Sequence, residues 1–285
     1  MKRVLYIVLT GLLLLAACDK IDAPYVRQNE DPTPNPGDTS QSDTSVFVKV
    51  KKVLLEEFTG HLCVNCPSAH ELAKELAEQY GGKLSIISIH AGYQAVTEGE
   101  FPEDFTCSVG DEIFAEYNNP FNPMGLINRN NSIPSISSAW TGEIAEEMAL
   151  EPEFAILLTP TYDTLTRLLN LNMKIKSWGE YSASLRYCVF ITENDIIAPQ
   201  KNNDPTIGET PVIEDYHHMH VLRGSMNGTW GNELGDTFVT DQEISKNLSL
   251  TLNEEWNASN CNAVAFIFDV ESKRILQVEE IKVIK

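Results

Sequence analysis

Two cysteines separated by two residues are the first feature of the sequence that could carry chemistry, in Cys63-Val64-Asn65-Cys66. This spacing lets the two sulfurs close a small ring, and a thiolate of such a pair can attack a disulfide in another protein. Pro67 follows directly, and proline suits the first turn of a helix because no amide donor is needed there. The motif predicts a redox pair at a helix start, with Cys63 as the exposed nucleophile and Cys66 as the resolving thiol.

The segments around the motif predict a β-α-β unit that would hold it. Residues 53–58 read as a strand, 68–80 carry apolar residues at helical spacing, and 84–89 form a short apolar run typical of a buried parallel strand. A right-handed crossover is expected between the two strands. A helix that begins at the motif would direct its free amides and its dipole at the sulfur of Cys63, which favours the thiolate.

The second half of the chain has a different pattern. From about Phe154 the helical period disappears, and segments of mostly alternating polarity are separated by turn residues. These segments read as strands, at 155–160, 167–177, 181–192, 217–223, 248–252, 263–270 and 275–283. Such a succession favours an antiparallel sandwich. We therefore expect a domain boundary near residue 150.

The first residues are typical of a secretory signal. Lys2 and Arg3 precede an apolar run over residues 4–15, and the small pair Ala16-Ala17 stands before Cys18. This ending resembles a bacterial lipobox, which implies cleavage before Cys18 and acylation of that cysteine. The alternative is an uncleaved anchor helix, but the run is shorter than the ~20 residues that a membrane span needs.

The predicted lipid anchor is followed by a linker. Residues 31–45 consist of Pro, Asp, Ser, Thr, Asn, Gly and Gln without an apolar side chain, which is typical of an extended tether. We therefore divide the start of the chain into a signal peptide, 1–17, and a lipidated N-terminus with flexible linker, 18–45. The body of the protein should lie in water and contact the membrane through the lipid on Cys18.

The charge of the chain argues against a nucleic-acid partner. Acidic residues outnumber basic ones by 41 to 21, and the formal net charge is −20. The negative electrostatic potential of such a chain repels a phosphate backbone. The densest basic run, Lys49 with Lys51 and Lys52, is too small to offset this repulsion. We expect no nucleic-acid partner, no cofactor and no bound metal.

A family resemblance extends through both halves. The order strand, turn, CxxC with proline, helix and strand resembles thioredoxins. Residues 56–60 (EEFTG) followed by the motif resemble, more narrowly, the lipoproteins related to outer membrane protein 28. The same likeness continues in the second half, at residues 216–223 (YHHMHVLR), at Trp230-Gly231 and at residues 264–267 (VAFI). The resemblance implies an outer membrane lipoprotein of the cell envelope, although Asp19 after the lipid cysteine would favour the inner membrane under one sorting rule.

The resemblance also implies a fold and further site residues. The fold would be a thioredoxin-like α/β domain at 46–150 followed by an all-β immunoglobulin-like sandwich at 151–285. Glu57 stands six residues before Cys63, where thioredoxins place a buried acid that relays a proton to the second cysteine. Pro123 is the best candidate for their cis-proline, with Pro120 second; such a bond would present a backbone edge to an extended substrate peptide.

Two departures from the thioredoxin pattern concern the motif itself. Leu62 replaces the usual tryptophan before the first cysteine, and Val64-Asn65 replaces Gly-Pro between the cysteines. The first change would alter substrate docking, and the second would shift the reduction potential.

Other interpretations of the cysteines and histidines stay open. The Cys63–Cys66 pair could be a static structural disulfide or half of a zinc site, although the other cysteines are scattered. Cys188 and Cys261 could bridge the sandwich or stay free, and Cys107 would then be unpaired. The histidines at 217, 218 and 220 favour a packing role over a metal site, because on a strand they would not share one face.

Two functions follow as hypotheses. The first is a membrane-tethered thiol–disulfide oxidoreductase acting on protein or peptide disulfides, in which Cys63 attacks, Cys66 resolves, Glu57 relays a proton and Pro123 positions the peptide. Acting as a reductase, it would need an electron donor that the sequence does not identify. The second is a non-enzymatic surface binding or adhesion lipoprotein in which the CxxC is structural.

Overall fold

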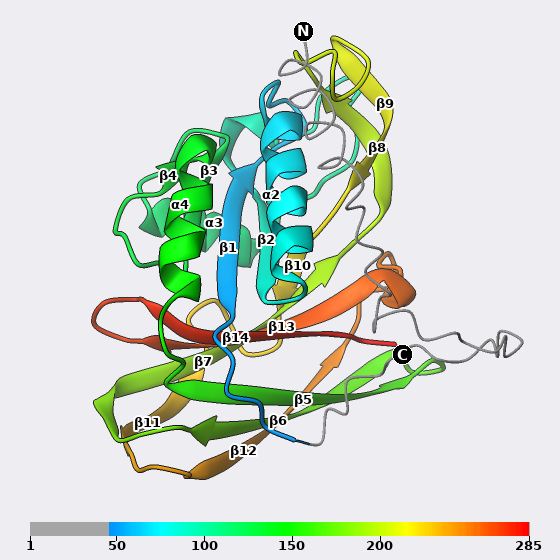
Figure 1. Ribbon diagram of the computed structural model, residues 1–285. Helices are drawn as coiled ribbons and strands as arrows, with labels where there is room; N and C mark the ends of the chain where they lie inside the picture. The colour runs from blue at the N-terminus through cyan, green and yellow to red at the C-terminus, as the bar shows by residue number, and fades with distance from the viewer. Residues whose placement is uncertain (1–45, 285) are drawn as a thin grey trace, which may run out of the picture. The chain divides into compact units, whose positions relative to one another are not determined.

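A computed structural model describes residues 46–284 (Figure 1). Residues 46–284 belong to one compact unit. The predicted signal peptide, the lipidation of Cys18 and the linker at 31–45 lie outside the described residues. The division at 150/151 stays a prediction; a short connection between a helix ending at Met148 and a strand starting at Phe154 lies there.

The described residues form three α-helices and a larger number of strands. The helices are α2 (Cys66–Tyr80), α3 (Ser108–Glu116) and α4 (Ser137–Met148), with short 3-10 turns η1 (Gly92–Gln94) and η2 (Ala258–Asn260). The strands of the first half are β1 (Val53–Thr59), β2 (Leu84–His90), β3 (Met124–Ile127) and β4 (Ser135–Ile136). Those of the second half are β5 (Phe154–Asp163), β6 (Leu168–Ser177), β7 (Tyr181–Glu193), β8 (Ile196–Lys201), β9 (Val212–His218), β10 (Val221–Ser225), β11 (Asn232–Phe238), β12 (Glu243–Thr251), β13 (Cys261–Asp269) and β14 (Ile275–Lys282).

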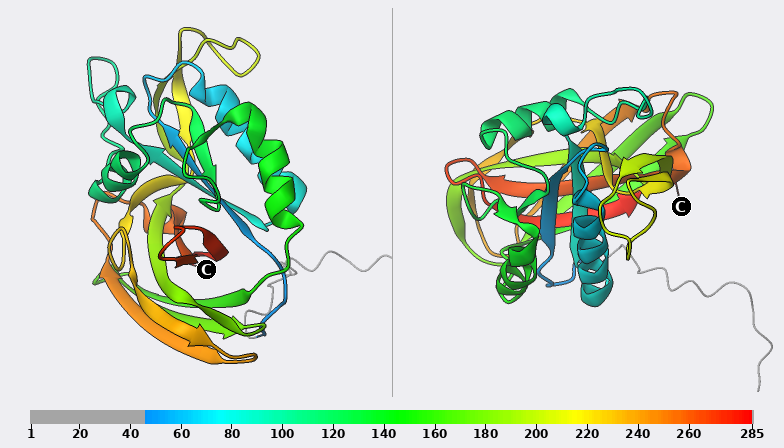
Figure 2. Two further views of the ribbon diagram at one scale, coloured as in Figure 1. Left: turned by 90° about the vertical axis from the view of Figure 1, so that its left-hand side faces the viewer. Right: turned by 90° about the horizontal axis from the view of Figure 1, so that it is seen from above.

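The expected β-α-β unit is present in the first half. Strands β1 and β2 are parallel from Val53↔Leu84 to Thr59↔His90, and every residue of both is buried. Side chains of β1 alternate between two cores. Val53 and Leu55 pack with α2 and α4, whereas Leu54 and Phe58 pack with α3. Helices therefore cover both faces of β1 and β2 (Figure 2).

The predicted fold class was wrong. Of the described residues, 44% lie in strands and 18% in helices, so residues 46–284 are mostly β. Strands from both halves form one nine-stranded sheet in the order β14-β13-β7-β10-β2-β1-β3-β4, with β11 paired to β7. The joint is the parallel pair β2 and β10, at Ser88↔Val221. The chain is thus not a self-contained thioredoxin-like α/β domain followed by a separate immunoglobulin-like sandwich. A pattern of alternating polarity identifies a strand but does not identify its partner strand. The pairing of β2 with β10 could therefore not be predicted from the sequence pattern.

The long strands β7 and β13 divide the interior of the second half. Tyr187 and Val189 face the smaller sheet β12-β6-β5, and Cys188 and Phe190 face the core that contains α3. Because successive side chains point to opposite faces, one strand serves two cores. The second half also contains a separate two-stranded hairpin, β8-β9, that lies beside the start of α2 (Figure 1).

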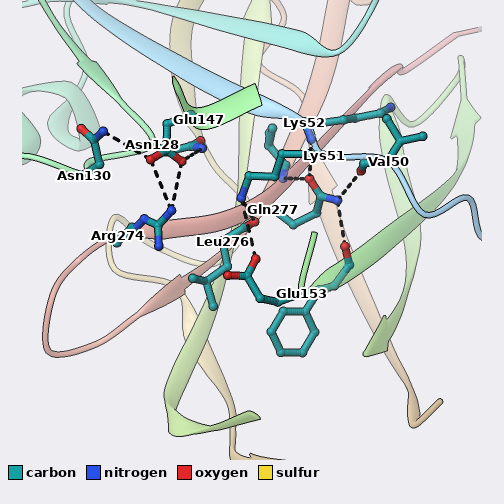
Figure 3. A network of polar contacts seen from close by, with 12 residues as sticks. Val50, Lys51, Lys52, Asn128, Asn130, Glu147, Glu153, Arg274, Leu276 and Gln277 are labelled. Atoms are coloured by element: carbon teal, nitrogen blue, oxygen red, sulfur yellow. Dashed lines mark hydrogen bonds and ion pairs between the residues drawn. The ribbon is translucent and has the colours of Figure 1, made fainter. Parts of the chain in front are cut away.

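A buried polar network ties the first described residues to the last strand (Figure 3). Lys51 Nζ donates to the carbonyl of Leu276 at 2.6 Å. Gln277 Nε2 donates to the carbonyls of Val50 and Phe154 at 2.9 and 2.8 Å. Because the chain entering β1 is held by β14, the position of β1 depends on the C-terminal strand.

The same figure shows a second group of contacts at the end of α4. Glu147 accepts from Asn128 Nδ2 at 2.8 Å and from Arg274 at 3.2 Å. The side chain of Asn128 also accepts from the amide of Leu54 at 2.9 Å. The carboxylate of Glu147 is buried but paired, which is how proteins offset the desolvation of a charge.

A fully buried ion pair crosses the first-half sheet. The side chains of Glu56 in β1 and Arg129 after β3 are both 0% exposed, and Arg129 Nε donates to Glu56 at 2.6 Å. The guanidinium also lies over the ring of Phe266 in β13, 5.2 Å from its centroid. The carboxylate of Glu56 raises the pKa of Arg129 further above its usual range, against the effect of burial.

Among residues 46–284, no helix is both long and apolar enough to span a membrane.

Candidate functional site

Cys63 and Cys66 form a disulfide at the start of α2. Their Cα atoms are 5.4 Å apart, and α2 begins at Cys66 with Pro67 in its first turn. The amide of Cys66 donates to the carbonyl of Cys63 at 3.3 Å, which closes the turn that joins the two residues. The predicted position of the motif, between β1 and a helix N-terminus, is therefore confirmed.

The exposure predicted for Cys63 was wrong. Cys63 is 1% exposed and Cys66 is 0% exposed, so solvent does not reach this disulfide. Val64 and Asn65, the two residues between them, are the exposed part of the motif. Sequence reasoning placed the motif correctly on the first half but did not foresee that the second half covers it.

The cover is the hairpin β8-β9 with its connecting loop, residues 196–218, which we call the cover hairpin. Gln200 Nε2 donates to the carbonyl of Cys63 at 2.9 Å. The amide of Lys201 donates to the carbonyl of His61 at 2.8 Å, and the amide of Asn203 donates to the carbonyl of Val64 at 3.1 Å. Backbone of the hairpin thus runs along the CxxC loop as an added extended segment.

Side chains extend this contact to α2. Asn203 Nδ2 donates to Asn65 Oδ1 at 2.7 Å, and Ser68 Oγ donates to Asp204 Oδ2 at 3.1 Å. The hydroxyl of Tyr216 in β9 lies 2.7 Å from His70 Nδ1. The cover hairpin is therefore fixed at its loop and along one strand.

Internal hydrogen bonds give the hairpin loop its shape. Asn202 Nδ2 donates to the carbonyls of Asp204, Gly208 and Glu209 at 2.9, 3.2 and 3.0 Å. The peptide bond between Thr210 and Pro211 is cis, and the Pro211 carbonyl accepts from the amide of Asn202 at 2.8 Å. The loop therefore has internal hydrogen bonds in addition to its contacts with the CxxC loop.

The other side of the CxxC loop approaches η1 closely. The amide of Leu62 donates to the carbonyl of Gln94 at 2.9 Å. A Cβ atom on Gly60 would come within 2.3 Å of that same carbonyl oxygen. Only glycine fits at position 60, because any side chain would displace the backbone of Gln94 or of the loop.

Glu57 is buried rather than solvent-facing, with 3% exposed. Its Oε1 accepts from Ser88 Oγ at 2.6 Å and lies 3.6 Å from His70 Nε2. Its Oε2 has no hydrogen-bond partner among the described residues. A buried carboxylate oxygen without a partner is costly, and such groups are common where a proton must be taken up.

His70 links Glu57 to the cover hairpin and was not among the predicted site residues. It lies four positions after Cys66, on the same face of α2. Its Nε2 lies 2.9 Å from Thr59 Oγ1, and its Nδ1 bonds to the hydroxyl of Tyr216. Burial, together with the charge of Glu57, raises the pKa of Tyr216 far above its usual value.

Pro123 lies beside the end of β1 and follows a cis peptide bond from Asn122. Strand β3 starts directly after it and pairs with β1 at Phe58↔Met124. Asn122 Nδ2 donates to the carbonyl of Thr59 at 3.0 Å. Pro123 and the CxxC motif therefore lie at the same end of β1, and Pro120 does not follow a cis bond.

Cys188 and Cys261 do not bridge. Cys188 in β7 pairs with Phe266 in β13, and Cys261 pairs with Glu193, so they lie five positions apart along paired strands, about 17 Å at ~3.4 Å per residue. Both thiols are free and buried, and burial raises the pKa of each to about 12. Cys107 is also free; its sulfur accepts from the amide of Gly110 at 3.4 Å.

The histidines of the second half occupy different environments. His217 is exposed and pairs with Asp195 at 2.5 Å, whereas His218 is 1% exposed. Strand β9 ends at His218, and His220 has a positive φ of 56°, so the strand periodicity that we expected for these residues stops before His220. Within the described residues, no group of three or more His, Cys, Asp or Glu side chains is arranged to hold a metal.

A hollow lies away from the disulfide. A hollow of about 740 Å³ is lined by residues of β7, β11, β12 and the turn after β10, among them Arg186, Tyr187, Asn227, Glu233 and Lys246. Arg186 donates to the carbonyls of Trp230 and Gly231 at 2.8 and 2.7 Å, which fixes one wall.

Comparison with protein families identifies the chain. The model of the family described as "Outer membrane protein Omp28" matches residues 111–285, which is more than half of the sequence. The chain belongs to the Omp28 family. It is accordingly an outer membrane lipoprotein of the cell envelope, as the resemblance predicted.

Solved structures resemble this Omp28 family member in fold. HBP35 of Porphyromonas gingivalis superimposes with a TM-score of 0.62 at 16% identity, over 84% of this chain and 77% of that one. A protein from Agrobacterium tumefaciens gives a TM-score of 0.50 at 11% identity, over 83% of this chain and 96% of that one. A domain of the outer membrane lipoprotein Omp28 from Porphyromonas gingivalis is a partial match, over 46% of this chain and 88% of that one at 20% identity, and its TM-score of 0.31 is too low for a statement about the fold. No curated protein matches the chain.

Proposed function

We propose that this outer membrane lipoprotein exchanges disulfides with protein substrates through Cys63 and Cys66. The observation that carries the proposal is the disulfide itself, closed across a CxxC turn at the N-terminus of α2. A helix N-terminus stabilises a thiolate through its free amides and dipole, so the cysteines occupy a place where a thiol becomes reactive once reduced.

Disulfide exchange proceeds through a mixed disulfide on Cys63. In the reduced protein, the thiolate of Cys63 attacks a substrate disulfide, forming a mixed disulfide and releasing one substrate thiolate, which takes a proton. Cys66 then loses its proton and attacks Cys63, which closes the disulfide seen here and releases the second substrate thiol. Two electrons pass to the substrate, and a dithiol carrier of the envelope must return them. The same steps in reverse oxidise a substrate dithiol.

Glu57 and His70 support a proton route to the second cysteine. His70 lies one helical turn beyond Cys66, and Glu57 lies 3.6 Å from His70 with one oxygen unpartnered. In the proposed mechanism Glu57 takes up the proton of Cys66 during resolution. A group of this kind contributes typically 10²–10⁴-fold to a proton-transfer step.

The cover hairpin defines a resting state in this proposal. A substrate sulfur must approach in line with the disulfide, and the present burial of both cysteines prevents this. Residues 200–203 lie along the CxxC loop in an extended form, so the hairpin occupies the place of a substrate peptide. Exchange therefore requires the hairpin to move aside, and Pro123 then borders the exposed edge.

The test is disulfide exchange with a model protein such as insulin, using full-length protein and the variants Cys63→Ser and Cys66→Ser. We expect Cys63→Ser to abolish turnover and Cys66→Ser to trap a mixed disulfide. The matched control is Cys107→Ser, which removes a half-buried thiol elsewhere and should leave the rate unchanged. Equal rates for the unaltered protein and Cys63→Ser would overturn the proposal.

A second function is favoured by the burial of the disulfide, 1% and 0% exposed. In that function the bond is structural, and the protein is a non-enzymatic binding lipoprotein with the hollow near Arg186 as a candidate ligand surface. The reduction potential separates the two functions. A value below about −300 mV marks a structural bond, and a higher value marks a working couple.

A further inference from the structure

Two buried histidines face each other beneath the cover hairpin. The ring centroids of His90, at the end of β2, and His218, at the end of β9, are 5.6 Å apart. His90 is 2% exposed and His218 is 1% exposed. Within the described residues, none of their four ring nitrogens has a partner with hydrogen-bond geometry. Buried polar atoms are nearly always hydrogen-bonded, so four unpartnered nitrogens in one place indicate a ligand-binding site.

The sheet joint brings these two side chains together. Strand β10 pairs with β2 at Val221↔Ser88, and the amide of Ser88 donates to the carbonyl of His220 at 2.8 Å. The short turn between β9 and β10 therefore places His218 opposite the last residue of β2. Because β2 belongs to the main sheet and β9 to the cover hairpin, the pair spans the boundary between the two.

The surroundings of the pair are aromatic. The ring of Phe105 lies 5.0 Å from that of His90 and 4.6 Å from that of His218, measured between centroids. The ring of Tyr216 lies 4.9 Å from His218. No carboxylate of the described residues bonds to either imidazole. Burial lowers the pKa of both imidazoles, so the neutral form, which has a free lone pair, is the one present at neutral pH.

The number of ligands narrows the choice of ion. Structural zinc takes four protein ligands, and calcium and magnesium take several oxygen ligands, whereas no carboxylate of the described residues bonds to either imidazole. Within the described residues, no cysteine, carboxylate or further histidine joins the pair as a third metal ligand. Two neutral, buried imidazoles surrounded by aromatic rings suit a soft monovalent d¹⁰ ion, Cu(I) or Ag(I), which accepts two-coordinate geometry.

We propose that His90 and His218 form a two-coordinate site for a soft monovalent cation, Cu(I) or its analogue Ag(I). Binding changes no oxidation state and releases no proton from neutral imidazoles. Since one ligand lies on the main sheet and the other on the cover hairpin, the bound ion also holds the hairpin over the disulfide. That last consequence rests on the proposed function, whereas the binding itself does not.

The experiment is calorimetric titration with Ag(I), which needs no reductant and so leaves the disulfide intact. Full-length protein with the acylated Cys18 is used, carrying Cys107→Ser, Cys188→Ala and Cys261→Ala to remove competing thiols. We expect one ion per chain, with the affinity lowered at least 100-fold in His90→Phe and in His218→Phe. Two controls, His217→Phe and Met219→Leu, remove an exposed imidazole and a nearby thioether and should bind as the background protein does.

A second measurement covers the event that a substituted protein fails to fold. The ¹⁵N signals of the buried imidazoles in the background protein should shift on addition of one equivalent of Ag(I), and no other histidine should shift as far. Absence of a one-to-one binding event, unchanged ¹⁵N signals or equal affinity in both phenylalanine variants overturns the site, and the pair then holds only water. If binding occurs but disulfide reduction by dithiothreitol is not slowed, the site stands and the link to the hairpin does not.

Discussion

Gln200 of the cover hairpin donates from its amide nitrogen to the backbone carbonyl of Cys63 at 2.9 Å. The side chain of Gln200 is fully buried, and the same nitrogen lies within reach of the carbonyls of Gly60 and Lys201. One side chain from the second half therefore fastens the loop that carries the first cysteine. This contact makes access to the disulfide dependent on a segment about 137 residues further along the chain.

Replacing Gln200 by alanine should expose the disulfide. Loss of a buried amide that makes these bonds weakens the hairpin's hold on the loop by about 1–3 kcal/mol, which corresponds to roughly 5- to 150-fold more of the open form. We expect the rate of disulfide reduction by dithiothreitol to rise within that range. The matched control is Gln277→Ala, which removes a buried glutamine bonded to Val50 and Phe154. An equal rise in both variants would show general destabilisation instead.

Replacing Glu57 by glutamine should slow the resolving step. The amide has a similar shape but takes up no proton, so the mixed disulfide on Cys63 should persist and turnover should fall by about 10²-fold. The free energy of unfolding should not fall, because the change also removes a buried charge. Glu71→Gln, a change at an exposed residue of α2 that pairs with Lys74, is the control. Unchanged turnover in Glu57→Gln would remove Glu57 from the mechanism while leaving the cysteines in it.

Stability should depend on His218 between pH 3 and pH 6.5. Burial lowers the pKa of His218 to about 3 in the folded protein, against about 6.5 in the unfolded chain. Between these two pH values the unfolded chain carries a proton on His218 that the folded protein does not. The contribution of neutral His218 to the free energy of unfolding is therefore complete above pH 6.5 and declines as the pH falls. The expected slope is about 1.4 kcal/mol per pH unit.

Urea unfolding of unaltered protein and of His218→Phe at several pH values measures this slope. The free energy of unfolding of His218→Phe should rise relative to that of the unaltered protein as the pH falls from 6.5, because phenylalanine does not titrate. His217→Phe serves as the control, since His217 is exposed and bonded to Asp195. Parallel curves for all three proteins would contradict the assignment.

Breaking the Glu56–Arg129 pair should be costly, and replacing both members should not. Arg129→Met leaves the carboxylate of Glu56 buried without a partner, which costs about 3–5 kcal/mol. The double variant Glu56→Leu with Arg129→Met removes both charges from a site that is already apolar around Phe266. We expect it to recover most of the loss in urea unfolding. A double variant no more stable than Arg129→Met would mean that the pair contributes more than charge compensation.

Local features of the site could be predicted from the sequence because they depend on neighbouring residues. The apolar run of β1, the proline after Cys66 and the helical spacing in α2 together place the motif at a strand-to-helix junction, where the structure has it. The disulfide itself follows from the two-residue spacing. The cis bond at Pro123 was expected only through the family resemblance, since the surrounding residues alone do not specify it.

Long-range features could not be predicted in the same way. The pairing of β2 with β10 joins Ser88 to Val221, and no pattern near either residue specifies the other. Gln200 contacts the carbonyl of Cys63 from the second half of the chain, and His70 lies between Glu57 and Tyr216. A histidine inside an amphipathic helix carries no local signal for such contacts. His90 had one signal, its place at the end of a fully buried strand.

The insertion of β10 between β7 and β2 sets an order for assembly during secretion. Cys63 and Cys66 leave the membrane well before residues 196–225, which complete the sheet and carry the hairpin over the motif. The two thiols are therefore open to the oxidants of the envelope while the rest of the chain is still emerging. Cys63 and Cys66 can therefore be oxidised before the cover hairpin closes over them, and the folded protein then retains a disulfide that formed earlier.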